Sequence, residues 1–462
     1  MNILTRRFKR GFISIVVGFA GGIFAFTSSV SGQAADAGTV AKKAADRMQA
    51  GNFQSAREAL REGLRQYPAS IELWNLLGIA EGESNRADAA KEAFLHGLKL
   101  APDSISLNEN MGFLFYREAD YRAAVSYLER AVALGSEKPG VRFSLAASWL
   151  RAGAPGKALA ELKVLEPSLG NRSDYWVERG TAELSQDAAA AGASFSRALQ
   201  MTPGSVPALN GAAYAAEKQG LDEKALAFLI QARNAAPDDV PTLTHFGALC
   251  IRRDLGLDAL AALTKAHQLQ PASNAALYLL ARANISLENW QQAFDLFAEF
   301  ARRVPRFGPT YFAMGWLDIK LDRVEQARAD LQKSLALDPN LKDARYELAQ
   351  LDLDDGQLNA SERLLEEVLK QDPHHAKANM AMGDLLMRKG KLAEAETYLE
   401  TAIHEDPKLA PAHYKLSMVF FRKHEMEQAE KEKTLAGALD AQASRASRTQ
   451  LRLELPESDV SQ

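Results

Sequence analysis

Residues 305–338 read PRFGPTYFAMGWLDIKLDRVEQARADLQKSLALD, and a proline, Pro339, follows directly. Four residues of this stretch fall at i, i+3, i+4 and i+7 and so share one face of a helix: Tyr311, Met314, Gly315 and Asp318. Ala327 and Leu331 begin a second stripe with helical spacing. Since proline cannot continue a helix, it ends the unit and opens the next one. The stretch therefore predicts an antiparallel pair of helices within a unit of about 34 residues.

The same unit recurs along most of the chain. Prolines stand 34 residues apart at Pro203, Pro237, Pro271, Pro305, Pro339, Pro373 and Pro407. Pro68 and Pro102 show the same step, and the interval from Pro102 to Pro203 is one residue short of three periods. Gly180 stands one residue closer than usual to its partner Phe195, which assigns the deletion to the turn SQDAAAAG, residues 185–192. A fixed period of this length indicates a repeat architecture.

Two columns of small residues explain how the helices of a unit meet. With the proline as position 32, twelve units run from Ala37 to about Ala443. Position 8 is always Gly, Ala or Ser: Ala44, Gly78, Gly112, Ala146, Gly180, Ala213, Gly247, Ala281, Gly315, Ala349, Gly383 and Ser417. Position 20 is always Ala or Ser: Ala56, Ala90, Ala124, Ala158, Ala191, Ala225, Ala259, Ala293, Ala327, Ser361, Ala395 and Ala429. Small residues at both positions let the two helices approach closely. Each pair can bury its apolar face only by stacking on its neighbours.

These columns, the large apolar residue at position 24 (Phe94, Phe297 or Leu331) and the prolines resemble the tetratricopeptide repeat family over residues 37–443. The resemblance implies an all-α, right-handed superhelical solenoid of about twelve helix-turn-helix units, with the first helices lining a concave groove. It does not imply one function, because a fold can carry many.

The two ends of the chain differ from the repeats. Residues 1–34 carry four basic residues, an uncharged apolar stretch from Gly11 to Phe26 and then small residues, which is typical of a secretory signal peptide cleaved after Ala34. An alternative is that this segment stays uncleaved and tethers the protein to a membrane. In the last unit Lys433 replaces the apolar residue at position 24, which predicts a polar cap on a solenoid of residues 35–443. Residues 444–462 are predicted to be a flexible tail, with some chance that the Leu451–Leu455 run docks.

Composition and motifs exclude several classes of protein. The single cysteine, Cys250, rules out an internal disulfide and any multi-thiolate metal site, and is expected to be a buried, inert thiol. A formal net charge of −4 does not suit a protein that coats nucleic acid. No zinc-binding helix motif, phosphate-binding loop or nucleophile elbow occurs, and the adjacent His374 and His375 are expected in a solvated turn. We therefore expect no enzyme activity, no metal and no cofactor.

The candidate binding residues form a strip along the expected groove in units eight to twelve. Position 5 carries Tyr278, Phe312, Tyr346, Met380 and Tyr414. Position 12 carries Ile285, Ile319, Leu353, Met387 and Phe421, and Trp316 lies between the two rows at position 9. Such a strip fits a protein-binding surface. A second interpretation stays open: positions 5 and 12 border the core, so that each of these residues could simply pack against the next first helix.

A line of basic residues occupies position 13. Its members are Arg117, Arg151, Lys218, Arg252, Lys320, Arg388 and Arg422. A cation near a helix C-terminus is favourable by a few tenths of a kcal/mol, which is the first interpretation. Contact with an acidic or polysaccharide partner is the second.

Together these features predict a non-enzymatic scaffold of the bacterial cell envelope, periplasmic or secreted, that binds an extended peptide or a partner subunit in its groove. The alternative is a substrate-recruiting or regulatory subunit for a separate enzyme, such as a glycosyltransferase or a polysaccharide synthesis or export machine. The few residues after the last repeat cannot form a catalytic domain of their own.

Overall fold

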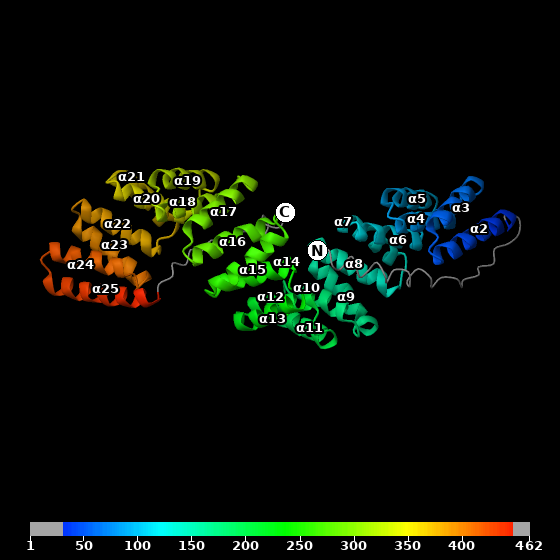
Figure 1. The fold of residues 1–462 in the computed structure, drawn as a ribbon, viewed down its shortest axis with the longest axis horizontal. Helices are drawn as coiled ribbons and strands as arrows, with labels where there is room; N and C mark the ends of the chain where they lie inside the picture. Colours follow the sequence, from blue (N-terminus) through cyan, green and yellow to red (C-terminus); the bar gives the residue numbers. More distant parts are fainter. Residues whose placement is uncertain (1–30, 447–462) are drawn as a thin grey trace. The chain divides into compact units, whose positions relative to one another are not determined.

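The structure is a computed structural model that describes the backbone of residues 31–446 and the side chains of residues 36–441. Over the described backbone it contains 24 helices and no strand (Figure 1). The prediction of an all-α helical repeat solenoid is confirmed.

The helices alternate between the first and the second helix of each unit. The first helices are α2 (Ser31–Gln49), α4 (Ile71–Glu83), α6 (Ile105–Arg117), α8 (Pro139–Arg151), α10 (Ser173–Glu183), α12 (Val206–Lys218), α14 (Val240–Arg252), α16 (Asn274–Ser286), α18 (Gly308–Lys320), α20 (Lys342–Asp354), α22 (Ala376–Arg388) and α24 (Ala410–Arg422). The second helices are α3 (Phe53–Gln66), α5 (Ala87–Leu100), α7 (Tyr121–Ala133), α9 (Pro155–Leu169), α11 (Ala188–Met201), α13 (Asp222–Ala235), α15 (Gly256–Leu269), α17 (Trp290–Arg303), α19 (Val324–Leu337), α21 (Leu358–Gln371), α23 (Leu392–Glu405) and α25 (Met426–Ala446).

The small residues at positions 8 and 20 allow the close approach of the two helices that the sequence predicts. A β-carbon added to Gly78 would lie 2.3 Å from Phe94, and one added to Gly315 would lie 2.8 Å from Leu331. Carbon atoms in contact normally stay about 3.5–4.0 Å apart, so only glycine fits these positions without movement. Ala90 and Ala327, at position 20, have no exposed surface.

In every described unit except the fifth, the turn between the two helices is closed by a residue in the left-handed backbone region. In unit four this residue is Gly153, with φ of +79°, and in unit two it is Asn85, with φ of +61°. The Arg86 amide then donates to the Glu81 carbonyl (3.0 Å), which satisfies an orphan carbonyl at the end of α4. The α10–α11 turn has no such residue among its described positions, and α10 has 11 residues where the other first helices from α4 onward have 13. Unit five is thus one residue short between the starts of its two helices, as the sequence predicts, but the shortening falls at the end of α10 rather than in the turn after it.

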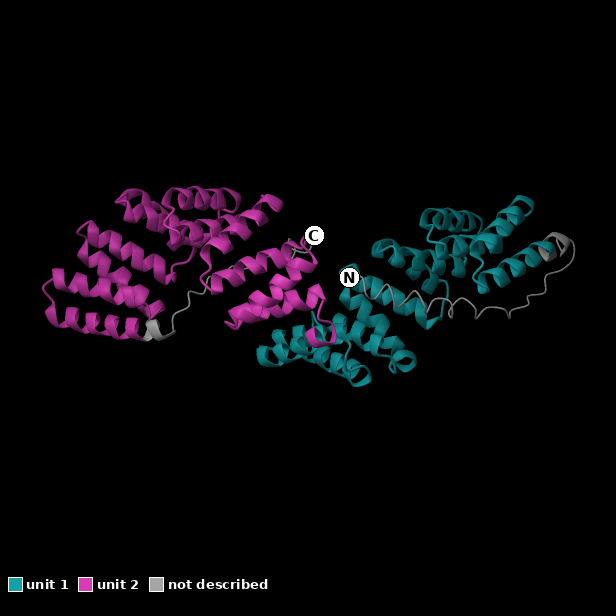
Figure 2. Ribbon diagram, in the orientation of Figure 1, with its two compact units in different colours: residues 1–232 teal, residues 233–462 magenta. Residues whose placement is uncertain are grey.

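The chain divides into two compact units, residues 1–232 and 233–462, with the division inside α13 (Figure 2). The second unit contains one core centred on Phe297 and Leu331 and another centred on Leu365 and Leu399. Every residue of the predicted binding strip belongs to the second unit.

The ends of the chain lie mostly outside the described residues. Of the predicted signal peptide, residues 1–30 are not described, and Ser31 to Ala34 form the start of α2. At the other end α25 continues to Ala446, and residues 447–462 of the predicted tail are not described. The Lys433 side chain is 64% exposed, as expected of a polar outer face. Within residues 31–446, no helix is both long and apolar enough to span a membrane.

Candidate functional site

Most of the predicted binding strip is buried, which corrects the expectation that these side chains lie open along a groove. The buried members are Tyr278 (0% exposed), Ile285 (5%), Phe312 (5%), Trp316 (6%), Tyr346 (8%), Leu353 (0%) and Met387 (4%). Ile319 and Met380 are partly buried and pack against the same cores. Of the two interpretations given by the sequence, packing in or beside the core therefore describes these residues better.

For Tyr278 and Trp316, aromatic rings of a second helix contribute to the burial. Tyr278 meets Phe297 and Phe300 of α17 edge to face, with ring centroids 5.2 and 5.1 Å apart. Trp316 packs edge to face on Trp290, the first residue of α17, at 5.6 Å. Position 9 lies away from the core face of its own helix pair, but the second helix of the preceding unit reaches it.

Two members of the strip do remain open. Tyr414 is 54% exposed and Phe421 is 62% exposed, and both lie on α24, the first helix of unit twelve. They are seven residues apart, so they share one face of the helix. At the same two positions in unit ten, Tyr346 and Leu353 are buried. The exposed aromatic pair on α24 is thus the part of the predicted strip that a partner can reach.

The basic line has a structural role in at least three units. Arg388 donates to the carbonyl oxygen of Leu353 (2.8 Å), and Arg422 donates to that of Met387 (3.0 Å). Arg117 makes the corresponding bond to Gly82 (2.7 Å). Each arginine therefore caps the first helix of the unit before its own, and this bond refines the first interpretation of these cations. Arg252 is exposed, and Lys320 lies 5.1 Å over the Trp316 ring.

Sequence analysis missed a column of buried carboxylates at position 11. Glu81 is 1% exposed and accepts hydrogen bonds from Arg57 (3.2 Å) and Arg61 (2.6 Å) of the preceding unit. Asp352 is held in the same way by Arg328. In both cases an arginine precedes the acid by 24 residues, and this spacing could have revealed the pairs.

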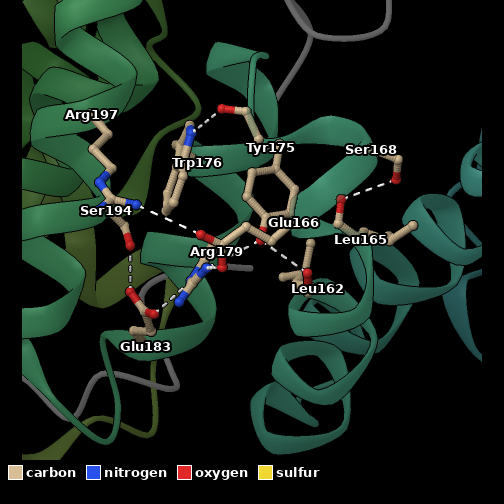
Figure 3. A network of polar contacts seen from close by, with 11 residues as sticks. Leu162, Leu165, Glu166, Ser168, Tyr175, Trp176, Arg179, Glu183, Ser194 and Arg197 are labelled. Carbon is tan, nitrogen blue, oxygen red and sulfur yellow. Dashed lines mark hydrogen bonds and ion pairs between the residues drawn. The ribbon is translucent and has the colours of Figure 1, made fainter.

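Unit five shows the most connected of these networks (Figure 3). Glu183 accepts hydrogen bonds from Ser194 (2.6 Å) and from Arg179 (2.9 Å). Arg179 also pairs with Glu166 of α9, and its ring neighbour is Trp176, 5.1 Å away. Both carboxylate oxygens of Glu183 therefore have a partner, as buried polar atoms normally do. The pair between Arg179 and Glu166 joins units four and five.

Asp318 is the exception in this column. It is 1% exposed, yet neither carboxylate oxygen accepts a hydrogen bond from a described residue. The residue 24 positions earlier is Phe294, so the usual arginine is missing, and Arg323 approaches only to 3.5 Å. Burial raises the pKa of Asp318. Burial, together with the charge of Asp318, also raises the pKa of the nearby Asp330 to about 6.

The other candidate reactive groups have structural surroundings. Cys250 is buried, as predicted, and burial raises the pKa of its thiol to about 12. His375 is not simply solvated: its Nδ1 accepts a hydrogen bond from the Ala378 amide (3.1 Å) and so caps α22. Within the described side chains, no group of three or more His, Cys, Asp or Glu residues is arranged to hold a metal ion.

Arg282, at position 9 of α16, is a second residue that sequence analysis missed. It is partly buried, and it makes no ion pair with any described carboxylate. Burial, and then the positive charge of Arg252, lower the pKa of this guanidinium. Arg282 occupies in unit eight the same position that Trp316 occupies in unit nine, but the sequence analysis singled out only the tryptophan.

Comparison with known proteins identifies the class. Two family models described as tetratricopeptide repeat match residues 318–385 and 352–417, and residues 42–105, 111–171 and 252–306, which together make up more than half of the chain. The chain belongs to the tetratricopeptide repeat family. Its repeats make it a protein–protein interaction scaffold, and this fold is typically non-enzymatic.

Among solved structures, the tetratricopeptide repeat protein YrrB, described as having an unusual peptide-binding site, is 19% identical, with 40% of this chain and 97% of that chain covered and a TM-score of 0.38. The Cut9–Hcn1 complex of APC/C is 14% identical, with 88% and 89% covered and a TM-score of 0.44. A tetratricopeptide repeat protein from Parabacteroides merdae is 14% identical, with 54% and 99% covered and a TM-score of 0.43. No curated protein matches the chain.

Proposed function

We propose that this protein is a non-enzymatic scaffold of the bacterial cell envelope that binds an extended segment of a partner protein along its first helices. The observation that carries the proposal is the exposed aromatic pair on α24, Tyr414 and Phe421. The large side chains at the same positions in units eight to eleven are buried or partly buried by neighbouring helices, whereas these two are exposed and can be buried by a partner. Aromatic residues that become buried in this way usually carry a large share of binding energy.

The location in the envelope rests on the N-terminal sequence alone. Basic residues, an uncharged apolar stretch and small residues follow one another in residues 1–34, in the order of an export signal. Cell fractionation and N-terminal sequencing of the purified protein test this part. A protein that begins at Met1 and stays in the cytoplasm would contradict it.

The binding role is tested with two matched variants. Tyr414→Ala with Phe421→Ala removes the exposed pair, and Leu257→Ala removes another strongly exposed apolar side chain (74%) on a second helix, α15. A partner captured from envelope extract by the unaltered protein is purified and its affinity measured for all three proteins. We expect the double variant to lose at least about tenfold in affinity and Leu257→Ala to lose little. Equal affinities with an unchanged melting temperature would refute the assignment of α24.

A further inference from the structure

The side chain at position 4 of the first helix often donates a hydrogen bond to the carbonyl oxygen six residues earlier, at position 32 of the preceding unit. Described units before the last make this bond from Trp74 to Pro68 (2.9 Å), Asn108 to Pro102 (3.1 Å), Trp176 to Gly170 (2.8 Å), Tyr311 to Pro305 (3.2 Å), Arg345 to Pro339 (2.6 Å) and Asn379 to Pro373 (2.9 Å). Because a carbonyl oxygen can only accept, position 4 supplies the N–H or O–H group wherever this bond is made.

In unit twelve, position 4 is occupied by His413, whose side chain is buried between two acceptors. Its Nε2 atom lies 3.2 Å from the Pro407 carbonyl oxygen, and its Nδ1 atom lies 2.6 Å from Oε2 of Glu432 on α25. The bond to Pro407 requires a proton on Nε2, as in the other members of the column. Nδ1 can then bond to Glu432 only if the pair holds one proton more than a neutral imidazole and an ionised carboxylate.

Unit four contains the same pair with an arginine in place of the histidine. Arg142 stands at position 4 of α8 and donates to Glu161 of α9 (2.7 Å). Glu161 and Glu432 both stand at position 23, so the two pairs join first helix to second helix at the same place in the repeat. An arginine stays charged throughout the physiological pH range, whereas a histidine changes its charge between about pH 5 and pH 8. The pair in unit twelve is therefore a titratable form of a pair that is permanent in unit four.

Other acids on the helices that pack against α24 have cations of their own. These pairs are Asp384 of α22 with Lys415 (2.8 Å), Glu396 of α23 with Lys423 (2.7 Å), Glu405 of α23 with His374 (2.8 Å) and Glu430 of α25 with Lys433 (3.9 Å). None of these four acids bonds to His413. Glu432 is therefore the carboxylate on which the bonding of the His413 ring depends.

The position of α25 makes this pair matter for local stability. An internal second helix such as α23 is covered by the first helix of the next unit, whereas α25 is the last described helix and packs mainly on α24. Since each unit of a solenoid is stabilised by its neighbours, a terminal helix depends more on the contacts within its own unit. When the pair loses its proton, the lone pair of Nδ1 faces an ionised oxygen, and the contact no longer stabilises α25.

We infer that His413 and Glu432 form a pH-sensitive contact that fastens α25 to α24 at mildly acidic pH and releases it as the pH rises. The stabilisation is present while the pair keeps its proton, so it is lost on the alkaline side. This inference does not depend on the proposed function, although the same repeat carries Tyr414 and Phe421.

Hydrogen exchange of the full chain, followed by mass spectrometry at about pH 5.5 and about pH 8.5, tests the inference. Glu432→Met removes the carboxylate from unit twelve, and Glu161→Met is the matched control in unit four. For each variant, the exchange rate in the second helix of its own unit, α25 or α9, is divided by the rate in the unaltered protein at the same pH. This ratio cancels the intrinsic effect of pH on exchange.

We expect Glu432→Met to accelerate exchange in α25 about tenfold at the lower pH, as for loss of a hydrogen bond to a charged group, and little at the higher pH. Glu161→Met should accelerate exchange in α9 by the same factor at both pH values. A ratio for α25 that is the same at both pH values, or larger at the higher one, would overturn the inference. An equal pH dependence in α9 would also overturn it, because that pair contains no histidine.

His413→Arg provides a second test that leaves the carboxylate in place. It gives unit twelve the pair of unit four, and an arginine at position 4 can still donate to the preceding carbonyl, as Arg345 does. We expect Glu432→Met, added to His413→Arg, to accelerate exchange in α25 equally at the two pH values. A pH dependence that persists in the His413→Arg background would mean that another group is responsible, and the inference would be wrong.

Discussion

Replacing Trp316 with alanine distinguishes a core residue from a binding residue at position 9. The Trp316 side chain is 6% exposed, stacks edge to face on Trp290 and belongs to the core that contains Phe297 and Leu331. Removing a buried tryptophan costs about 3–5 kcal/mol, because transfer energy is lost and a cavity remains. Part of this cost is the aromatic pair itself, which contributes about 0.5–1.5 kcal/mol beyond its buried area.

The matched control is Tyr214→Ala, since Tyr214 occupies position 9 of unit six and is 47% exposed. Urea unfolding followed by far-UV circular dichroism measures both variants, and this signal does not depend on the tryptophan that is removed. We expect a large fall in the urea midpoint for Trp316→Ala and a small change for Tyr214→Ala. Because contacts in a solenoid join neighbouring units, hydrogen exchange should accelerate first in α17 to α19. A midpoint for Trp316→Ala equal to that of the unaltered protein would refute the packing described here.

Three further predictions concern the second unit. Ala327→Leu should destabilise by about 1–3 kcal/mol, measured by urea unfolding, because Ala327 has no exposed surface. The Asp330 carboxyl, with its pKa raised to about 6, binds its proton more tightly folded than unfolded, so stability falls as the pH rises from about 4 to about 6 and stays lower above that range. Asp330→Asn should therefore raise the melting temperature at pH 7.5, and this gain should vanish near pH 4; a gain that is independent of pH would contradict the assignment. Arg388→Met, which removes the bond to the Leu353 carbonyl, should speed hydrogen exchange at the end of α20 by up to about tenfold, while an unchanged rate would contradict its capping role.

The fold could be predicted from the sequence because the repeat is built from local contacts. The small residues at positions 8 and 20 touch partners within the same unit, such as Gly315 against Leu331, so a column of single residues reports directly on the packing. The one-residue deletion before Phe195 could be located for the same reason. It shortens the end of α10, and the second helix, α11, keeps the 14 residues found in most other second helices.

The candidate site was harder to predict because it depends on contacts between units. Tyr278 and Tyr414 occupy the same position, yet one has no exposed surface and the other is 54% exposed. An angle on a helical wheel is identical for both, whereas burial is decided by the helices that pack over each one. The unpaired state of Arg282 is equally invisible in the sequence, since it depends on which carboxylates of other helices come close.

The composition of unit twelve argues that its exposed aromatic pair serves binding. At position 24 of this unit the apolar residue of other repeats is replaced by Lys433, which is 64% exposed, so the second helix is adapted to water. The first helix of the same unit keeps a tyrosine and a phenylalanine at positions where no described helix covers them. If solubility alone governed this face, both helices would carry polar residues. A unit that is polar on its second helix and aromatic on its first is better explained by a partner that covers Tyr414 and Phe421.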